Sequence, residues 1–156
     1  TVMKIHKLIE PENVFLDLAG ADSRSALKAV ASVLAEPLDL DSEEVAGSLL
    51  EREGLGSTSV GDGFAIPHCK IDGLEKIVIG LARFDPPVPF GDATQQPVAF
   101  MFVVLSPPDH PAAHLQVLSQ IARVLKRRDL RAALLAAADA EGVTKTLCEA
   151  AEAEGL

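Results

Sequence analysis

The chain has 156 residues, enough for one domain with a sizeable core, and its 48% hydrophobic and 24% charged residues are typical of a soluble globular protein. Its 14 Lys and Arg against 23 Asp and Glu give a formal net charge of -9, which argues against nucleic acid and anionic lipid as partners. Within this acidic chain, Lys126-Arg127-Arg128 is a candidate for a local basic surface.

No segment predicts export or direct membrane insertion. The start of the chain lacks the continuous apolar core of a signal peptide. The longest apolar stretches reach eight residues, far short of the ~18 that span a bilayer. Cys69 and Cys148 are far apart and lack CxxC spacing, which favours free thiols in a reducing compartment. We therefore expect a cytoplasmic protein.

Hydrophobic patterning predicts both helices and strands. In chain order, the predicted elements are a strand at 13–18, helices at 23–36 and 41–53, strands at 64–69, 76–84 and 97–107, a helix from about 111 to 128, and short helices at 129–138 and 141–153. Asp22 should cap the first helix, and Asp41 with Glu44 has the spacing of a capping box at the second. Segments 76–84 and 97–107 are apolar nearly throughout, as in strands covered on both faces.

Helices before and after a set of buried strands predict a sheet between helical layers. Several connections between the strands are too short for helical crossovers, so the sheet should be mixed. The predicted class is α/β (α+β). We expect a single domain over residues 1–156, with a mixed central sheet of about five strands and helices on both faces.

The segment GFAIPHCK (63–70) places a histidine at the end of a short apolar run. Pro67 fixes its own φ and favours an extended conformation for Ile66 before it. Side chains alternate in an extended segment, so His68 should share one face with Phe64 and Ile66. This pattern suits a reactive imidazole at the rim of the core, and it equally suits a histidine that only completes the core.

Arg52 falls on the same helical stripe as Val45 and Leu49. A guanidinium at the end of an apolar stripe either extends to solvent or meets an anion. A cation is also favourable at any helix C-terminus, and this simpler explanation stays open.

His114 precedes Leu118, Ile121 and Leu125 at helical spacing, so it should lie in the first turn of a buried face. A lone histidine there is more often a hydrogen-bonded core residue than a functional one. However, a helix N-terminus also attracts anions.

Two further patterns could bind a phosphate or a metal ion. The segment GSTS (56–59) offers the hydroxyls of Ser57 and Thr58 and flexible backbone N–H groups, which would serve a phosphate or merely a turn. His110 and His114 are four residues apart, and together with the adjacent His68 and Cys69 they could supply the four ligands of a zinc site. No HExxH or paired-cysteine pattern supports it, so we expect no metal.

Taken together, the segment EREGLGSTSVGDGFAIPHC (51–69) resembles the active-site region of the enzyme IIA domains of the bacterial phosphotransferase system, in the branch shared by fructose, mannitol and nitrogen-regulatory members. The matching elements are Arg52-Glu53, Gly56-Ser57-Thr58, Gly63, Ala65-Ile66-Pro67-His68-Cys69, Gln96-Pro97-Val98 and His114-Leu115. The resemblance covers residues 5 to 150 and is most similar to the nitrogen-regulatory enzyme IIA.

The resemblance implies a role for each candidate residue. His68 would accept a phosphoryl group from a phosphohistidine carrier protein (HPr-like) and pass it on, as a phosphotransferase without cofactor or metal. His114 would donate a hydrogen bond to the phosphoryl oxygens, and Arg52 would neutralise developing charge. Ser57 and Thr58 stay candidates for contact with the phosphate because of their hydroxyls, with a simple turn as the alternative. The resemblance implies regulatory proteins, kinases, potassium-transport components or a IIB domain as targets.

The sequence departs from the family pattern at two places. Cys69 replaces the glycine that most often follows the histidine, and Thr94-Gln95-Gln96 stands where the family often carries an acidic residue. Two alternatives to the nitrogen-regulatory relay remain open. One is a fructose- or mannitol-type sugar-transport carrier, and the other is an interaction module of the same fold that no longer relays phosphate.

Overall fold

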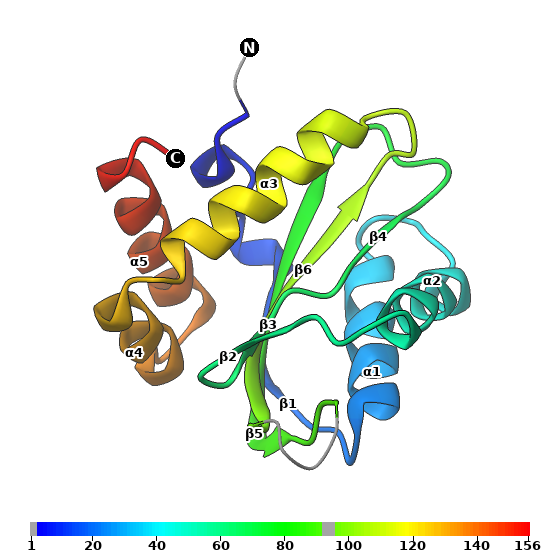
Figure 1. Cartoon of the computed structure of the whole chain (residues 1–156), viewed down its shortest axis with the longest axis horizontal. Coiled ribbons are helices and arrows are strands. Elements are labelled where there is room, and N and C mark those ends of the chain that lie inside the picture. The colour runs from blue at the N-terminus through cyan, green and yellow to red at the C-terminus, as the bar shows by residue number, and fades with distance from the viewer. Residues whose placement is uncertain (1–2, 92–95) are drawn as a thin grey trace.

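One six-stranded sheet lies between two layers of helices in the computed structural model, which describes residues 3–91 and 96–156 (Figure 1). The strands are β1 (Val14–Leu18), β2 (Ser59–Gly61), β3 (Phe64–Ala65), β4 (His68–Lys70), β5 (Val78–Val88) and β6 (Val98–Ser106). Their order is β1-β5-β6-β3-β2. Strand β4 follows β3 along the same edge of β6, where β3 pairs with residues 100–101 and β4 with residues 104–106. The β1–β5, β3–β6 and β4–β6 pairs are parallel, whereas β5–β6 and β2–β3 are antiparallel. The predicted mixed α/β fold is confirmed.

The two helical layers bury opposite faces of this sheet. Helices α1 (Ser23–Ala35) and α2 (Ser42–Gly54) pack on one face. The other face is covered by α3 (Pro111–Val124), α4 (Arg128–Ala136), α5 (Ala140–Ala153) and the 3-10 helices η1 (Ile5–Lys7) and η2 (Pro11–Asn13) (Figure 1). Strand β6 contributes to both layers, since Phe100, Phe102 and Val104 face α3–α5 while Met101, Val103 and Leu105 face α1 and α2. This accounts for its continuous apolar sequence.

The helix caps differ in part from the prediction. Asp22 caps α1 by accepting from the Ser25 N–H at 2.8 Å, and the Ser25 hydroxyl accepts from the Asp22 N–H at 3.1 Å, so the capping box lies here. The box predicted for Asp41 and Glu44 is wrong. The short Asp41 carboxylate instead accepts from the Glu43 N–H at 3.0 Å, one residue nearer in the chain.

The segment predicted as one strand at 64–69 divides into β3 and β4. Pro67 has no N–H to give to the ladder, so pairing is interrupted and resumes at His68, which lies opposite Val104 of β6. The three-residue β2 was not predicted, because its short sequence around Gly61 has the composition of a turn. With these two additions, the four strand segments placed by the sequence become six strands, one more than the sheet of about five that was expected.

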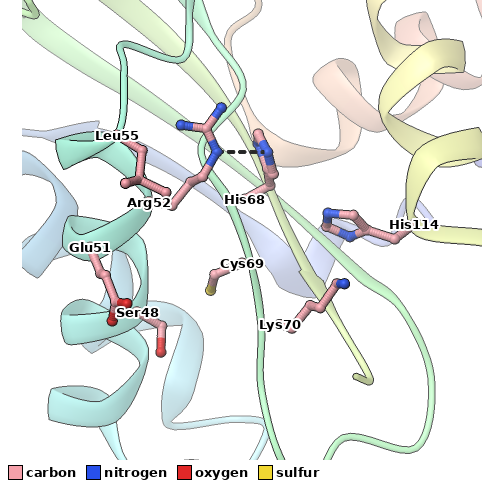
Figure 2. A pocket seen from close by; sticks show the side chains of 8 residues that line it. All are labelled: Ser48, Glu51, Arg52, Leu55, His68, Cys69, Lys70 and His114. Carbon is pink, nitrogen blue, oxygen red and sulfur yellow. Dashed lines mark hydrogen bonds between the residues drawn. The ribbon is translucent and has the colours of Figure 1, made fainter. Parts of the chain in front are cut away.

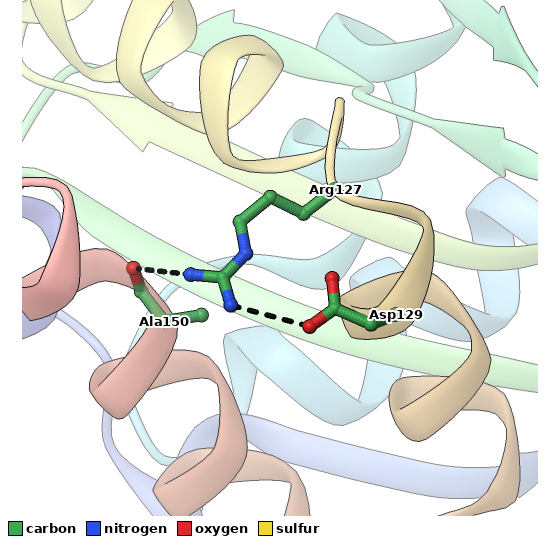
Figure 3. A network of polar contacts seen from close by, with 3 residues as sticks. All are labelled: Arg127, Asp129 and Ala150. Carbon is green, nitrogen blue, oxygen red and sulfur yellow. Dashed lines mark hydrogen bonds and ion pairs between the residues drawn. The ribbon is translucent and has the colours of Figure 1, made fainter.

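The basic run at 126–128 is partly used inside the fold. Arg127 donates to the Ala150 carbonyl of α5 at 3.3 Å and pairs with Asp129 at 3.2 Å, which ties the start of α4 to α5 (Figure 3). Lys126 and Arg128 are exposed. In the part of the chain that the structure describes, the helices are all too short or too polar to cross a membrane.

One property of the sheet determines where the site lies. β2 pairs with β3 only, and among the described residues the single strand partner of β4 is β6. The outer edge of β4 is therefore open at His68. The C-terminal half of α2 packs beside this edge, and the N-terminus of α3 lies over the adjoining face of the sheet (Figure 1).

Candidate functional site

A pocket of about 490 Å³ lies where the end of α2, strand β4 and the start of α3 meet (Figure 2). Its lining residues are Ser48, Glu51, Arg52, Leu55, His68, Cys69, Lys70 and His114. The structure thus brings together Arg52, His68 and His114, which the sequence marked separately.

The hydrogen bonds of His68 define its tautomer. Its Nδ1 lies 2.8 Å from the Ile66 carbonyl oxygen, which can only accept, so Nδ1 carries the proton. Its Nε2 lies 3.2 Å from Nε of Arg52, which can only donate, so Nε2 carries the lone pair (Figure 2). His68 therefore presents a nucleophilic nitrogen to the pocket beside a fixed positive charge.

Burial is the main cause that lowers the pKa of His68 below its ordinary value of 6.5. The hydrogen bond to Ile66 opposes this shift, and the positive charge of Arg52 adds to it. The imidazole is therefore mostly neutral at pH 7, which is the form that can act as a nucleophile.

Arg52 belongs to α2, which packs on the face of the sheet opposite to α3. Its side chain passes the unpaired edge of β4 to reach His68. Its Nη1 donates to the Gly56 carbonyl at 3.0 Å, which fixes the guanidinium plane against the loop after α2. Glu53 holds the same loop. Its carboxylate accepts from the Thr58 N–H at 2.9 Å and from the Thr58 hydroxyl at 2.6 Å.

Thr58 and Ser57 do not line the pocket. Thr58 is buried and its hydroxyl proton is given to Glu53, while the Ser57 hydroxyl accepts from the Ser59 N–H at 3.1 Å. Through these hydrogen bonds, both residues stabilise the loop after α2, whose Gly56 carbonyl accepts from Arg52. Their contact with a phosphate remains a prediction.

His114 lies in the first turn of α3, as its spacing predicted, and its side chain is only 6% exposed. Its ring centroid is 5.5 Å from that of His68, with the two planes at 53°. The Nδ1 atom lies 2.6 Å from the hydroxyl oxygen of Ser106, the last residue of β6. Burial is the main cause that lowers the pKa of His114, and the charges of His68 and Lys70 act in the same direction.

Lys70 and Ser106 were missed by the sequence analysis. Strand alternation indicates that Lys70 shares the face of His68 and that Ser106 shares the face of Val104, but the meeting of these residues at one site depends on how β4 pairs with β6. Lys70 is exposed, and its ammonium group lies on the His114 side of the pocket (Figure 2). It adds a second cation to a lining that also contains the Glu51 carboxylate, so cations outnumber acids here although the chain has a net charge of -9.

Cys69 packs on the α2 side of the sheet, opposite to the faces of Phe64 and Ile66, as predicted. Burial raises the pKa of its thiol to about 12, so it is not a thiolate at neutral pH. Cys69 and Cys148 are both free thiols. Among the described residues, no three His, Cys, Asp or Glu side chains are arranged to hold a metal ion, and the exposed His110 contacts Asp109 at 3.2 Å.

Two large apolar side chains are exposed near the pocket. Leu55 follows Arg52 at the end of α2 and is 81% exposed, and Leu115 follows His114 and is 66% exposed. They give the rim of a charged pocket an apolar surface of the kind that protein partners contact. Thr94 and Gln95, part of the second departure from the family pattern, lie outside the described residues.

Comparison with known proteins identifies the family to which the chain belongs. Residues 7–150 match the family model described as "Phosphoenolpyruvate-dependent sugar phosphotransferase system, EIIA 2". The chain is 39% identical to a nitrogen regulatory protein of Bradyrhizobium diazoefficiens, with 93% of this chain and 95% of that protein covered. It is 31% identical to a fructose-specific EIIA component of Haloferax volcanii, with 97% and 99% covered. The crystal structure of nitrogen regulatory protein IIA-Ntr from Neisseria meningitidis superposes with a TM-score of 0.84, at 29% identity and with 92% and 98% covered.

The chain therefore belongs to the EIIA type 2 family of the phosphotransferase system, a family of phosphotransferases, and the predicted family is confirmed. Of the two relatives compared above by sequence, the chain is more similar to the one named nitrogen regulatory, with 39% identity against 31%.

Proposed function

We propose that this chain is a cytoplasmic phosphoryl-relay protein of the nitrogen-regulatory branch, with residues 1–156 forming one enzyme IIA domain. His68 accepts a phosphoryl group from a phosphohistidine carrier protein, and the phosphorylation state of His68 is the signal. The observation that supports the proposal most directly is the convergence of Arg52, His68 and His114 on one pocket.

The relay step follows from the tautomer of His68. The Nε2 lone pair attacks the phosphorus of the donor phosphohistidine, and a new P–N bond forms as the old P–N bond breaks. The electron pair of the broken bond returns to the donor imidazole. Arg52 releases Nε2 and donates to the phosphoryl oxygens, where a fixed cation stabilises the spread charge of the transition state. Onward transfer to an acceptor is the same reaction in reverse.

Phosphorylation changes the surface that a partner meets. A phosphoryl group adds a charge of about -1.5 to -2 at neutral pH, a magnitude taken from phosphorylated hydroxyl side chains. On His68 this charge would appear in the pocket that Arg52, Lys70 and the exposed Leu55 line, so the phosphorylated and unphosphorylated forms would present different net charges to a partner. A regulatory protein, a kinase or a component of potassium transport could distinguish these two forms without direct phosphoryl transfer.

Phosphoryl transfer from a radiolabelled carrier protein tests the proposal. Wild type should gain label that is acid-labile and alkali-stable, as expected of a phosphohistidine, and His68→Ala should gain none. His110→Ala is the matched control, because His110 is exposed and lies outside the pocket lining, and it should label like wild type. An unlabelled wild type would favour the interaction module, and rapid onward transfer to a purified IIB domain would favour the sugar-transport alternative.

A further inference from the structure

We propose that Ser106 is a positioning residue that sets the tautomer of His114: its hydroxyl donates to Nδ1 and thereby keeps the imidazole proton on Nε2. The assignment of this proton concerns the unphosphorylated protein. Only its consequence for phosphoryl transfer rests on the function proposed above.

The strand pairing places Ser106 under His114. In the parallel β4–β6 ladder, His68 lies opposite Val104 and Lys70 lies opposite Ser106. Val104 packs in the core beneath α3, and Ser106, two residues further along β6, points to the same face. The Ser106 side chain is fully buried at 0% exposure, and its oxygen is 2.6 Å from Nδ1 of His114. At this distance the two atoms must share a proton, because neither can approach the other so closely with two lone pairs.

Only two proton arrangements fit this contact. If Nδ1 carried the proton and donated to the serine, the serine hydroxyl hydrogen would need another acceptor. Among the described residues, the hydrogen bonds of the Ser106 hydroxyl comprise only the one to His114. A buried hydroxyl without an acceptor costs roughly 1–3 kcal/mol. If the hydroxyl donates to Nδ1, both groups are satisfied, and the imidazole proton lies on Nε2.

This arrangement determines what His114 can offer to the pocket. Nδ1 is occupied by Ser106, so Nε2 is the nitrogen left to face the pocket, and the ring centroids of His114 and His68 are 5.5 Å apart. With its proton on Nε2, the neutral ring is a hydrogen-bond donor to phosphoryl oxygens. With the opposite tautomer, Nε2 would present a lone pair to an anion. The lowered pKa of His114 makes the tautomer important, because a neutral imidazole carries only one ring proton, on either Nδ1 or Nε2.

The arrangement also explains why a histidine can serve at this position without a positive charge. In many functional histidines, a backbone carbonyl or a carboxylate accepts a hydrogen bond from the ring nitrogen that faces away from the site. In this protein the Ser106 hydroxyl occupies that place. A carbonyl or carboxylate at this place would accept from Nδ1–H and produce the unfavourable tautomer. A hydroxyl can donate, and it is therefore suited to a ring that must itself donate on the other side.

Side-chain ¹⁵N NMR of histidine-labelled, unphosphorylated protein tests the assignment directly. In wild type the His114 proton should be found on Nε2, whereas in Ser106→Ala a substantial share of the Nδ1–H form should appear. Ser119→Ala, an exposed serine on α3, is the matched control and should leave the His114 spectrum unchanged. Ser106→Thr keeps the hydroxyl and should keep the Nε2–H form of His114.

Phosphoryl transfer provides the second measurement. Ser106→Ala should still become labelled on His68, at a rate about tenfold below wild type, as expected for the loss of roughly one hydrogen bond in the transition state. A wild-type His114 that carries its proton on Nδ1 would overturn the inference, as would a Ser106→Ala protein with wild-type tautomer and wild-type rate. If wild type has the Nε2–H form but accepts no phosphate from the carrier, the relay proposal fails while the assignment of Ser106 stands.

Discussion

Replacement of Arg52 by alanine should slow phosphoryl transfer far more than it weakens the fold. Within the described part of the chain, Arg52 makes two hydrogen bonds, at 3.2 Å to Nε2 of His68 and at 3.0 Å to the Gly56 carbonyl. Loss of a preorganised donor to charge that develops in a transition state typically lowers the rate by about 10²–10³. The Gly56 carbonyl is in an exposed residue and can bond to water instead, so the stability loss should be about 1 kcal/mol or less.

Rapid-quench measurement of transfer from a phosphorylated carrier protein, together with urea unfolding, separates the two effects. Arg52→Ala should transfer about 100-fold more slowly or worse, with an unfolding midpoint close to wild type. Arg52→Lys should fall between, because lysine keeps the charge but not the fork of donors. Arg123→Ala is the matched control, since it removes one exposed positive charge from the last turn of α3, outside the pocket lining.

Two results would refute this reasoning. Equal transfer rates in wild type and Arg52→Ala would show that the guanidinium does not stabilise the transition state. A large drop in the unfolding midpoint of Arg52→Ala, with transfer falling only in proportion to the folded fraction, would show that the residue is structural.

Three further predictions follow from the pKa shifts and the loop contacts. The pKa values of His68 and His114 are lowered in the folded state, so the unfolded chain binds more protons as pH falls below about 6.5, and folding stability should drop there. Between about pH 7 and about pH 5, the free energy of unfolding measured in urea should fall less for His68→Gln than for wild type. An equal fall in the two proteins would contradict the lowered pKa of His68. Iodoacetamide should modify Cys69 more slowly than Cys148 in the folded protein, because Cys69 is buried and its pKa is raised to about 12, and mass spectrometry of digested peptides measures this. Equal rates in folded protein would argue against that burial. Glu53→Ala should cost about 2 kcal/mol of unfolding free energy, since it removes the acceptor of both Thr58 hydrogen bonds, and a midpoint equal to wild type would show that the loop does not depend on them.

The sequence predicted the parts of this site that follow from regular periodicity. Helical spacing placed His114 on the buried stripe of its helix, and strand alternation placed His68 with Phe64 and Ile66. The meeting of Arg52 with His68 could not be predicted in this way. The two residues come from helix and strand layers whose relative position depends on the sheet order, and in particular on the edge that β4 leaves open.

The missed residues have the same explanation. Ser106 matters because β4 and β6 pair in one register, and a shift of one residue would turn its hydroxyl to the opposite face. Register between strands 36 residues apart is a tertiary property that the pattern of one strand does not contain. The break between β3 and β4 is different, because it could have been predicted from the sequence. Pro67 has no N–H to donate to a strand ladder, although the segment 64–69 was expected to form one strand.

The parallel pairing of β4 with β6 has a consequence for quality control in the cell. The arginine, the two imidazoles and the serine are spread over the chain from position 52 to 114, and they come together only after this non-local ladder has closed. An incompletely folded molecule would carry His68 without its supporting groups. Under the proposed function, such a molecule would be a poor phosphate acceptor, so that damaged or nascent copies would contribute little false signal.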